Sequence, residues 1–456
     1  MADITARLAE IVGEANVSTG AGIAEDYQRD EGLLSVPTLP EAVVRPDTTD
    51  EVARVLAVCD QERVPVTARG SGTGLSGAAV PIEGGVLVSF ERMAQILEID
   101  DDNHVAVVQP GVTLEQLDAA TRQHGLIYPV FPGEYSASLG GNVATNAGGM
   151  RAVKYGVTRH QVLGLEAVLA NGEVIRTGGK FVKSTSGYDL TQLVIGSEGT
   201  LALVTEAVLK LHPRLDHVAT VLTPFATLDE VAHAVPRLVA SGIGPMILEY
   251  IDMITMSAVV ANAGIDLGVP EDVKATALAY LVVVIEQRTE DRLDEDVAAL
   301  AELLAGLGAI DVYVLPSTAG TGLIDAREKA FWVAKASGAD EIIDLVVPRA
   351  AIPAYLGAVA QLAEASGSWV VGCGHAGDGN VHLSVFQADE AKRNELLTEL
   401  FRAGLDLGGA ISGEHGIGLA KKHLFTTLED PAKLALMARI KAAFDPNGIL
   451  NPGKIF

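Results

Sequence analysis

Residues 64–77 read VPVTARGSGTGLSG, a β-type run that leads into a loop rich in glycine. The G-x-G-x-x-G pattern that begins at Gly72 has the spacing of the Rossmann dinucleotide fingerprint, which requires a helix directly after it. The chain instead continues AAVPIEGGVLVSF, with Pro81 and two glycines where the first turns of that helix would lie. Because both residue types break helices, we reject an NAD-binding Rossmann unit.

The loop 70–77, here the first glycine loop, is one of three such loops. The second glycine loop is SLGGNVATNAGG at 138–149, and the third is IGSEGT at 195–200. Backbone N–H groups in tight turns can form a concave nest for phosphate oxygens, and glycine permits both the close approach and positive φ. An ordinary tight turn is the alternative for each loop. Together the three loops fit a long ligand that crosses several backbone segments, as a dinucleotide does.

Composition excludes several classes of protein. The 456 residues predict two to three domains. With 33 basic and 59 acidic residues the net charge is −26, so we expect no nucleic-acid partner. The two cysteines, Cys59 and Cys373, imply no disulfide framework and cannot supply the four ligands of a [4Fe–4S] cluster. Electrons collected by such a protein would have to leave to an external acceptor.

Apolar stretches such as residues 277–285 are far shorter than the roughly 20 residues that span a bilayer. The N-terminal sequence MADITARLAEIVGE lacks the basic and apolar regions of a signal peptide. We therefore expect a cytoplasmic protein with no integral membrane segment. Peripheral contact with a membrane stays open.

The texture of the chain changes after Pro213. Before it, helices are predicted at 50–64, capped by Thr48 or Thr49, and at 114–124, and Asn171-Gly172 predicts a hairpin. After it, helical runs at 228–240, 290–307 and 321–336 alternate with strands at 279–287 and 340–347, and Pro236 is expected to kink or end the first run. We predict domains at 1–213 and 214–410, with a segment 411–456 that returns to the first domain.

The motifs resemble the FAD-binding family of the vanillyl-alcohol oxidase type. Within it, the sequence is most similar to the branch of D-lactate dehydrogenase, D-2-hydroxyglutarate dehydrogenase and the flavoprotein subunit of glycolate oxidase. The matching motifs, spread over residues 38–456, are VVRP, ARGSGTGLSG, VQPGV, GGNVATNAGG with KYG, KSTSGYDL, IGSEGTLALVTEAVLKL, GCGHAGDGNVH, SGEHGIG and NPGKIF. The resemblance implies an α+β fold, with a two-subdomain FAD-binding domain and a cap domain whose antiparallel sheet is covered by helices.

The resemblance also implies which residues bind FAD. The first glycine loop would wrap the pyrophosphate, the second would line the dinucleotide, the third would lie near the adenosine, and Asn451 near the flavin. The expected cofactor residues are Pro46, Arg69, Gly70, Ser71, Gly72, Thr73, Gly74, Leu75, Ser76, Gly77, Pro132, Ser138, Gly140, Gly141, Asn142, Thr145, Asn146, Gly148, Gly149, Glu198, Gly199, Val204 and Asn451. Relatives with covalent flavin use a His or Cys near the first loop, which this sequence lacks, so we expect non-covalent FAD.

The stretch 375–382 reads HAGDGNVH and predicts a metal site. His375 and His382 are seven residues apart, which on an unbroken strand would put them on opposite faces, but the Gly-Asp-Gly between them permits a turn that lets both imidazoles converge. Imidazoles suit Zn²⁺, Mn²⁺ or Fe²⁺, with Zn²⁺ the preferred expectation, and Glu414 could add a carboxylate. The family relation supports the same three ligands, and hydrogen-bonded core histidines are the alternative.

Three further residues complete the expected site. His415 is the candidate general base, because an imidazole titrates near neutral pH. The family places an Arg at Arg327 against the substrate carboxylate, although locally it could pair with Asp325 or Glu328 on a solvated surface. Asn380 would help to hold the carboxylate end. The resulting hypothesis is metal-assisted oxidation of a 2-hydroxy acid to a 2-oxo acid, with hydride transfer to flavin N5, and the resemblance implies the D enantiomer.

One position departs from the family pattern. Relatives that act on 2-hydroxyglutarate carry a Lys where Ile342 stands, if the alignment has no gaps there. An apolar residue argues for a monocarboxylate such as D-lactate or glycolate. The expected acceptor is electron-transfer flavoprotein, a quinone or a cytochrome, and a homodimer stays open. Other hypotheses are a dicarboxylate dehydrogenase, a subunit that assembles with an iron–sulfur partner, another flavoenzyme of the same fold, or a non-catalytic binder.

Overall fold

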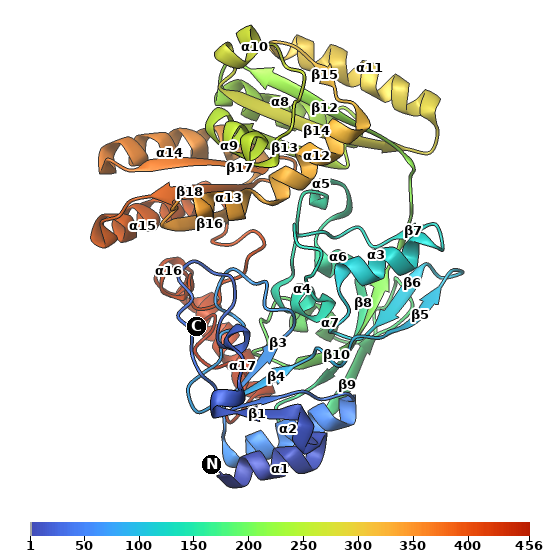
Figure 1. The fold of residues 1–456 in the computed structure, drawn as a ribbon, viewed down its shortest axis with the longest axis vertical. Coiled ribbons are helices and arrows are strands. Elements are labelled where there is room, and N and C mark those ends of the chain that lie inside the picture. Colours follow the sequence, from blue (N-terminus) through green and yellow to red (C-terminus); the bar gives the residue numbers. More distant parts are fainter. Residues whose placement is uncertain (1) are drawn as a thin grey trace. The chain divides into compact units, whose positions relative to one another are not determined.

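The computed structural model describes residues 2–456, which form two compact units (Figure 1). The first unit contains the chain up to Ala147, together with Val157–Arg214 and Glu414–Phe456. The second unit contains Gly148–Gly156 and Leu215–Gly413. The chain therefore passes from one unit to the other several times, and each unit has hydrophobic clusters of its own.

Two main sheets build the first unit. One has four strands in the order β1-β2-β4-β3, with the last three parallel, and the other has five antiparallel strands in the order β5-β6-β10-β8-β9. The strands are β1 (Val17–Thr19), β2 (Ala42–Val44), β3 (Val66–Arg69), β4 (Val86–Ser89), β5 (Ile96–Asp100), β6 (Val105–Val108), β8 (Val162–Val168), β9 (Val174–Gly178) and β10 (Leu203–Lys210), with β7 (Leu126–Ile127) and β11 (His212–Pro213) forming a separate pair.

Helices of the first unit begin where the sequence offers caps. Thr48 accepts a hydrogen bond from the backbone N–H of Glu51 at the start of α2, and Thr113 and Gln116 form a capping box at the start of α3. The helices are α1 (Ala2–Val12), α2 (Thr49–Glu62), α3 (Leu114–Arg122), α4 (Leu139–Thr145), α6 (Thr158–Gln161), α7 (Leu190–Val194), α16 (Lys422–Leu428) and α17 (Pro431–Phe444), and short 3₁₀ turns lie at Glu14–Asn16, Gly20–Gly22 and Glu25–Gln28.

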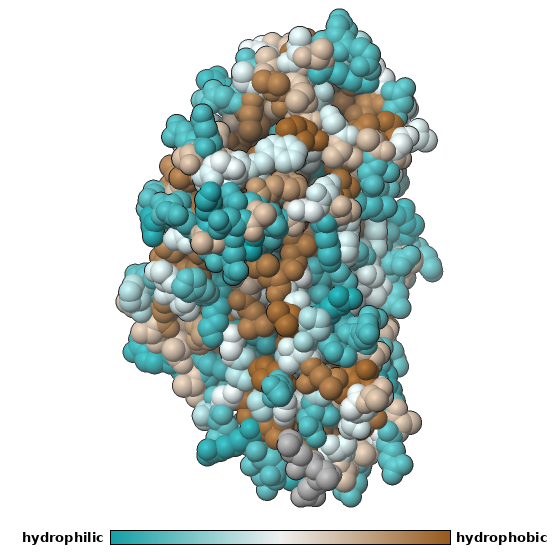
Figure 2. All heavy atoms as spheres, turned by 60° about the vertical axis from the view of Figure 1, so that its left-hand side comes forward, coloured by the Kyte–Doolittle hydropathy of each residue, from teal (hydrophilic) through white to brown (hydrophobic). Residues whose placement is uncertain are grey.

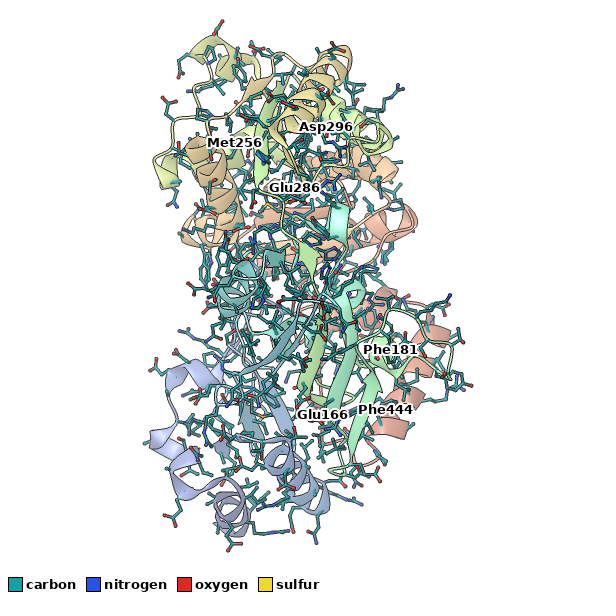
Figure 3. The ribbon with its side chains drawn as sticks, turned by 90° about the vertical axis from the view of Figure 1, so that its right-hand side faces the viewer. Glu166, Phe181, Met256, Glu286, Asp296 and Phe444 are labelled. Carbon is teal, nitrogen blue, oxygen red and sulfur yellow. The ribbon has the colours of Figure 1, made fainter. Side chains whose placement is uncertain are left out.

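The first glycine loop follows β3 and leads to β4 without forming a helix. This absence of a helix between residues 70 and 85 confirms that the unit is not a Rossmann unit. The predicted hairpin also forms, since β8 and β9 pair on either side of Asn171-Gly172. Glu166 on β8, labelled in Figure 3, is buried. Its carboxylate contacts Thr49, Thr205 and the Arg176 guanidinium.

A single antiparallel sheet of seven strands forms the second unit, in the order β15-β12-β14-β13-β17-β18-β16. The strands are β12 (His217–Phe225), β13 (Ile247–Asp252), β14 (Ala279–Gln287), β15 (Tyr313–Val314), β16 (Glu341–Val346), β17 (Trp369–His375) and β18 (Asn380–Phe386). The helices are α5 (Ala152–Tyr155), α8 (Leu228–Ala240), α9 (Met253–Ala263), α10 (Glu271–Thr276), α11 (Glu290–Gly306), α12 (Ser317–Glu328), α13 (Ala330–Ala336), α14 (Ile352–Ser366) and α15 (Glu390–Asp406), with a 3₁₀ turn at Arg349–Ala351.

One expected helix, 228–240, forms with the expected bounds, and another is divided in two. Pro236 does not end α8, which continues to Ala240, because the buried side chains of Val231, Val235 and Leu238 hold the helix in place despite the lost backbone hydrogen bond. The run 321–336 forms two helices, α12 and α13, which are separated at Lys329.

The segment 148–156 belongs to the second unit, although the sequence predicts it within the first domain, 1–213. Lys154 Nζ donates to Glu286 Oε1 on β14 at 2.9 Å, and the Tyr155 hydroxyl contacts the same carboxylate. Glu286, labelled in Figure 3, is 7% exposed, so these donors meet a carboxylate that has lost most of its water.

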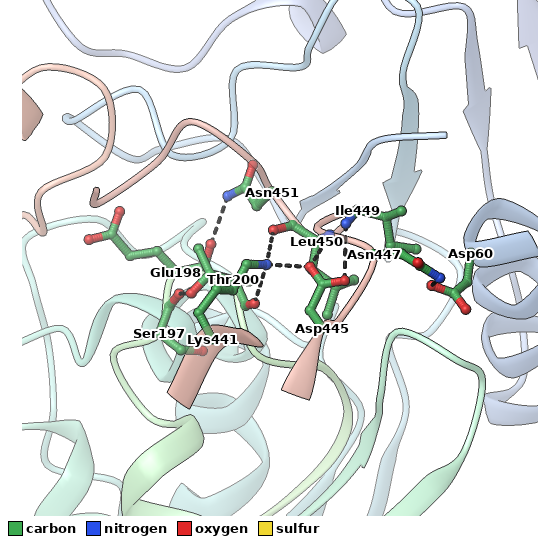
Figure 4. Close-up of polar contacts among 10 residues, drawn as sticks. All are labelled: Asp60, Ser197, Glu198, Thr200, Lys441, Asp445, Asn447, Ile449, Leu450 and Asn451. Atoms are coloured by element: carbon green, nitrogen blue, oxygen red, sulfur yellow. Dashed lines mark hydrogen bonds and ion pairs between the residues drawn. The ribbon is translucent and has the colours of Figure 1, made fainter. Parts of the chain in front are cut away.

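The C-terminal segment is bound to the third glycine loop by the partly buried Lys441 (Figure 4). Lys441 Nζ on α17 donates to the carbonyl oxygens of Thr200 and Leu450, both at 2.7 Å, and contacts the Asp445 carboxylate. Asp445 in turn accepts from the backbone N–H groups of Ile449 and Leu450. Partial burial lowers the pKa of the Lys441 ammonium, and the Asp445 carboxylate opposes this shift.

Within residues 2–456, none of the helices combines the length and apolar character that a bilayer crossing requires. The face in Figure 2 shows hydrophobic side chains interspersed among hydrophilic ones.

We predict that Lys441→Met lowers the free energy of unfolding by about 3–5 kcal/mol, because it leaves the fully buried Asp445 carboxylate without its cation. The control is Lys433→Met on the same helix, whose ion pair with Glu429 is exposed and should contribute less than about 1 kcal/mol. Urea denaturation of both variants measures the difference. If both variants lose the same free energy of unfolding, the contacts of Lys441 do not stabilise the C-terminal segment more than an exposed ion pair would.

Candidate active site

The three glycine loops line a cavity in the first unit. Its walls include, among the expected cofactor residues, Gly70, Ser71, Gly72, Thr73, Gly74, Leu75, Pro132, Ser138, Gly141, Asn142, Thr145, Glu198 and Gly199. A second cavity shares Gly70, Gly141 and Gly199 with the first and adds Arg69, Gly140 and Val204. The two cavities therefore adjoin along shared walls, as an elongated ligand requires.

Close backbone approach explains two of the glycines. A Cβ on Gly70 would lie 1.8 Å from Ser138 Oγ, so only glycine lets the first and second glycine loops meet there. The contact is reinforced by hydrogen bonds in both directions, from the Ser138 N–H to Ser71 Oγ at 2.9 Å and from the Ser71 N–H to Ser138 Oγ at 3.3 Å. Gly72 adopts a φ of +76°, which side chains disfavour.

These residues fit a bound dinucleotide. Asn142 Nδ2 is buried, lies on a residue that lines the first cavity, and has no hydrogen-bond partner among residues 2–456. A buried donor without a partner is unfavourable, and a polar ligand in the cavity would satisfy it. The glycine loops also leave the backbone accessible where a Cβ would close it.

Seven expected cofactor residues lie outside both cavities. They are Pro46, Ser76, Gly77, Asn146, Gly148, Gly149 and Asn451, of which Gly148 and Gly149 belong to the second unit. Asn451 instead joins parts of the protein: its Nδ2 donates to the carbonyl oxygens of Glu198 at 2.7 Å and Ala78 at 3.0 Å (Figure 4). Its Oδ1 accepts from the Thr67 hydroxyl at 3.3 Å.

The second unit brings His375 and His382 together. β17 and β18 form a hairpin in which His375 lies opposite Asn380, and His382 is two residues further along β18. Opposed residues and residues two apart share a face of a sheet, so both imidazoles point to the same side. Their ring centroids are 4.8 Å apart, with one nitrogen of each ring within 4.8 Å of the other. The turn at Gly377–Gly379 therefore lets the two imidazoles converge, as the sequence predicts.

Glu249 on β13 is a site residue that sequence reasoning missed. Its carboxylate, fully buried, accepts from His375 Nδ1 at 2.6 Å and pairs with Arg327 Nη2 at 2.7 Å. Arg327 is 6% exposed, so the expected alternative of a solvated pairing with Asp325 or Glu328 is wrong. The available signal was an acidic residue inside the apolar run MILEYI, because a buried carboxylate needs cationic or hydrogen-bonding partners.

A second buried carboxylate, Asp344 on β16, lies opposite His382 in the sheet. Asp344 accepts from Asn380 Nδ2 at 2.8 Å, from the Ser412 hydroxyl at 2.7 Å and from the Gly413 N–H at 3.2 Å. A Cβ on Gly413 would lie 1.7 Å from Asn380 Nδ2, which accounts for the glycine. The chain is thus anchored to Asp344 immediately before Glu414.

The Asn380 amide has a defined orientation. Because Nδ2 donates to Asp344, Oδ1 points away from that carboxylate, and it is buried without a hydrogen-bond partner among the described residues. An unsatisfied buried acceptor suits a hydroxyl proton or a cation. Nδ2 has a second N–H besides the one that donates to Asp344, so the role expected for Asn380, to hold the substrate carboxylate, stays a prediction.

Two neighbouring positions on this face are apolar or neutral. Cys373 lies opposite His382 and packs in an apolar cluster, and burial raises the pKa of its thiol to about 11. Ile342 is two residues from Asp344 on β16 and is partly buried, so it lies on the same face as the histidines.

Glu414 and His415 lie in the first unit, where both line the cavity formed by the glycine loops. Of the expected catalytic and metal-binding residues, the second unit therefore contains Arg327, His375, Asn380 and His382. The first unit contains Glu414 and His415. Gly413 and Glu414 are covalent neighbours across the boundary between the units.

Comparison with protein families identifies the class of protein. A model described as the FAD binding domain matches residues 40–178, and one described as the C-terminal domain of FAD linked oxidases matches residues 214–455. The chain belongs to the FAD-linked oxidase family and is an FAD-linked oxidoreductase. The family resemblance predicted from the motifs is confirmed.

Relatives cover the whole chain. An uncharacterized FAD-linked oxidoreductase of Mycobacterium tuberculosis is 58% identical over 100% of this chain and 99% of its own length. A D-lactate dehydrogenase of Archaeoglobus fulgidus is 41% identical over 91% of this chain and 90% of its own. A glycolate oxidase subunit of Bacillus subtilis is 38% identical over 100% of this chain and 97% of its own.

Solved structures confirm the predicted fold. The structure of p-cresol methylhydroxylase with substrate bound has a TM-score of 0.79 and covers 100% of this chain and 96% of that one, at 18% sequence identity. At that identity the likeness concerns the fold alone, which is that of the vanillyl-alcohol oxidase type.

We predict that Asn142→Ala weakens FAD binding by about 5- to 15-fold, the equivalent of one hydrogen bond of about 1–1.5 kcal/mol. Quenching of flavin fluorescence during titration of the apoprotein measures the dissociation constant. Asn447→Ala is the control, because Asn447 is exposed and bonds to Asp60 outside the cavity. Unchanged affinity in Asn142→Ala would refute the assignment of this amide to the cofactor.

Proposed function

We propose that the protein is an FAD- and divalent-metal-dependent dehydrogenase that oxidises a D-2-hydroxy acid to the 2-oxo acid. The observation that carries the proposal is the pair of imidazoles of His375 and His382 on one face of the sheet, with Glu249 bonded to His375 Nδ1. The relatives named glycolate oxidase subunit and D-lactate dehydrogenase support a small hydroxy acid as substrate.

The donor set suits a metal such as Zn²⁺, Mn²⁺ or Fe²⁺. The hydrogen bond from His375 Nδ1 to Glu249 fixes the tautomer, so Nε2 carries the lone pair that a cation needs. His382 would supply a second imidazole, and Glu414, which follows the anchored Gly413, would supply a carboxylate. Such a cation would polarise the hydroxyl and a carboxylate oxygen of the substrate.

The remaining residues would bind the substrate and move its proton. Arg327 would bind the substrate carboxylate, to which a planar guanidinium is well matched. Asn380 Oδ1 would accept from the 2-hydroxyl in the ground state, and His415 would take the hydroxyl proton as general base. Bound FAD supplies the hydride acceptor for the α-hydrogen.

FAD would be held without a covalent bond, since the first glycine loop offers neither His nor Cys. The residues that would hold it are those of the two cavities, from the first, second and third glycine loops. Both cysteines, Cys59 and Cys373, are buried and separate, so an external acceptor such as electron-transfer flavoprotein, a quinone or a cytochrome would receive the electrons.

The direct test is a panel of D- and L-2-hydroxy acids, with anaerobic bleaching of the FAD absorbance as readout, in the presence and absence of a chelator. Reduction by D-lactate or glycolate that depends on metal supports the proposal. Reduction at the same rate with and without chelator would contradict the proposed role of the metal.

A second candidate function is the flavoprotein subunit of a glycolate oxidase-like complex, which the B. subtilis relative favours. In that case the isolated chain should show little activity with an artificial acceptor.

His375→Ala should abolish stoichiometric metal binding, and Glu249→Gln should weaken metal affinity about 10- to 100-fold, because Glu249 only orients the ligand. Metal content by mass spectrometry and titration with Zn²⁺ measure both effects. His233→Ala, an exposed histidine on α8, is the control and should bind metal normally. Full metal content in His375→Ala would overturn the ligand assignment.

The substrate chain length is the finer part of the proposal. Ile342 would favour a monocarboxylate, so Ile342→Lys should raise the ratio of kcat/KM for D-2-hydroxyglutarate over D-lactate about tenfold, equivalent to about 1.4 kcal/mol. Ile342→Met is the control, because it keeps an apolar side chain of similar size. If Ile342→Lys and Ile342→Met give the same ratio of kcat/KM values, the residue at position 342 does not set the substrate specificity.

A further inference from the structure

The segment 414–420, which carries the candidate base His415, has no regular secondary structure at its start. Gly416 and Gly418 in this segment have φ values of +81° and +52°. A loop of this kind needs outside contacts to hold one conformation, since its own backbone supplies few hydrogen bonds. Two residues of the glycine loops provide them.

Glu198, in the third glycine loop, holds the segment through its carboxylate. Oε1 accepts from the Ile417 N–H at 2.7 Å and Oε2 accepts from the Gly418 N–H at 2.8 Å. A Cβ on Gly416 would lie 2.9 Å from Glu198 Oε1, so the segment passes directly over the carboxylate. Glu198 is 5% exposed, and Lys421 and Lys454 are the cations near it.

The backbone of Glu198 is itself fixed. Its N–H donates to the carbonyl oxygen of Ala144 on α4 at 2.8 Å, and its carbonyl oxygen accepts from Asn451 Nδ2 at 2.7 Å (Figure 4). Ala144 lines both cavities. The carboxylate that holds the segment is therefore attached to a wall of the cofactor site.

Ser76, at the end of the first glycine loop, holds the segment from another side. Its hydroxyl lies 2.9 Å from the carbonyl oxygen of His415 and 3.0 Å from that of Gly416, and donates to this pair. Its carbonyl oxygen accepts from the N–H groups of Leu419 at 2.8 Å and Ala420 at 3.1 Å. Backbone groups from His415 to Ala420 are thus bound to the first and third glycine loops.

We propose that Glu198 is a positioning residue for His415: it holds the backbone that directs this imidazole, without touching the substrate. The inference rests on the proposed role of His415 as general base. Two charge-assisted hydrogen bonds from consecutive N–H groups restrict the backbone just after His415, and Ser76 restricts it at His415 itself. Placement of the base is therefore built into the loops that line the cofactor cavity.

Hydrogen exchange of the FAD-bound protein tests the contact itself. In Glu198→Gln the amide NH₂ would face an N–H donor, so one of the two bonds is lost, and exchange across residues 414–420 should become about tenfold faster. Glu166→Gln is the matched control, because Glu166 is an equally buried carboxylate of the same unit that contacts other segments. Unchanged exchange in Glu198→Gln would overturn the proposal.

Anaerobic stopped-flow reduction of FAD by D-lactate tests the consequence. We expect Glu198→Gln and Ser76→Ala each to slow reduction at saturating substrate about 10- to 100-fold, with the substrate dissociation constant changed less than about threefold, and Glu166→Gln to retain the wild-type rate. In the double variant Glu198→Gln/His415→Ala the rate should be no lower than in His415→Ala, because both changes remove one function.

The outcomes separate the two proposals. If His415→Ala reduces FAD at the wild-type rate, His415 is not the base and the proposed mechanism fails, whatever the exchange data show for Glu198. If His415→Ala is slow but the loss in Glu198→Gln multiplies with it in the double variant, Glu198 acts independently of His415 and the positioning role is overturned.

Discussion

A carboxylate that is removed from water has to be met by donors, and this requirement organises both units of the protein. In the second unit Glu249, with no exposed surface, lies on a central strand and is met by His375 and Arg327. In the first unit Glu198 is met by two backbone N–H groups of the C-terminal segment. Each of these carboxylates thereby fixes residues that come from distant parts of the chain.

The same constraint gives the candidate site its chemical character. Glu249 fixes the tautomer of His375 and holds Arg327 in the interior, where a guanidinium is otherwise unfavourable. Asp344 binds Asn380 and the two residues before Glu414, and leaves the Asn380 oxygen as a buried acceptor. The polar groups on this face of the sheet are therefore oriented by buried acids, and such fixed orientation favours efficient catalysis.

In the first unit the main constraint is different, because the backbone has to come close to a large ligand. The glycines of three loops allow segments that are far apart in sequence to come into contact, as Gly70 and Ser138 do. The C-terminal segment contacts the first and third glycine loops through Asn451, Lys441 and the residues after His415. The C-terminal segment is consequently part of the structure that holds the cofactor site.

Patterns among neighbouring residues are enough to predict several features: the capped helices, the hairpin at Asn171-Gly172, the absence of a Rossmann helix after the first glycine loop, and the turn that pairs His375 with His382. The sequence motifs also identify the family. Other features emerge only when the chain is folded: Glu249 pairs with His375 and Arg327, Asn451 and Ser76 join distant segments, and residues 148–156 pack with the second unit. Those contacts depend on the register between strands and loops that are distant in the chain, 126 residues apart for Glu249 and His375, and no local pattern encodes that register.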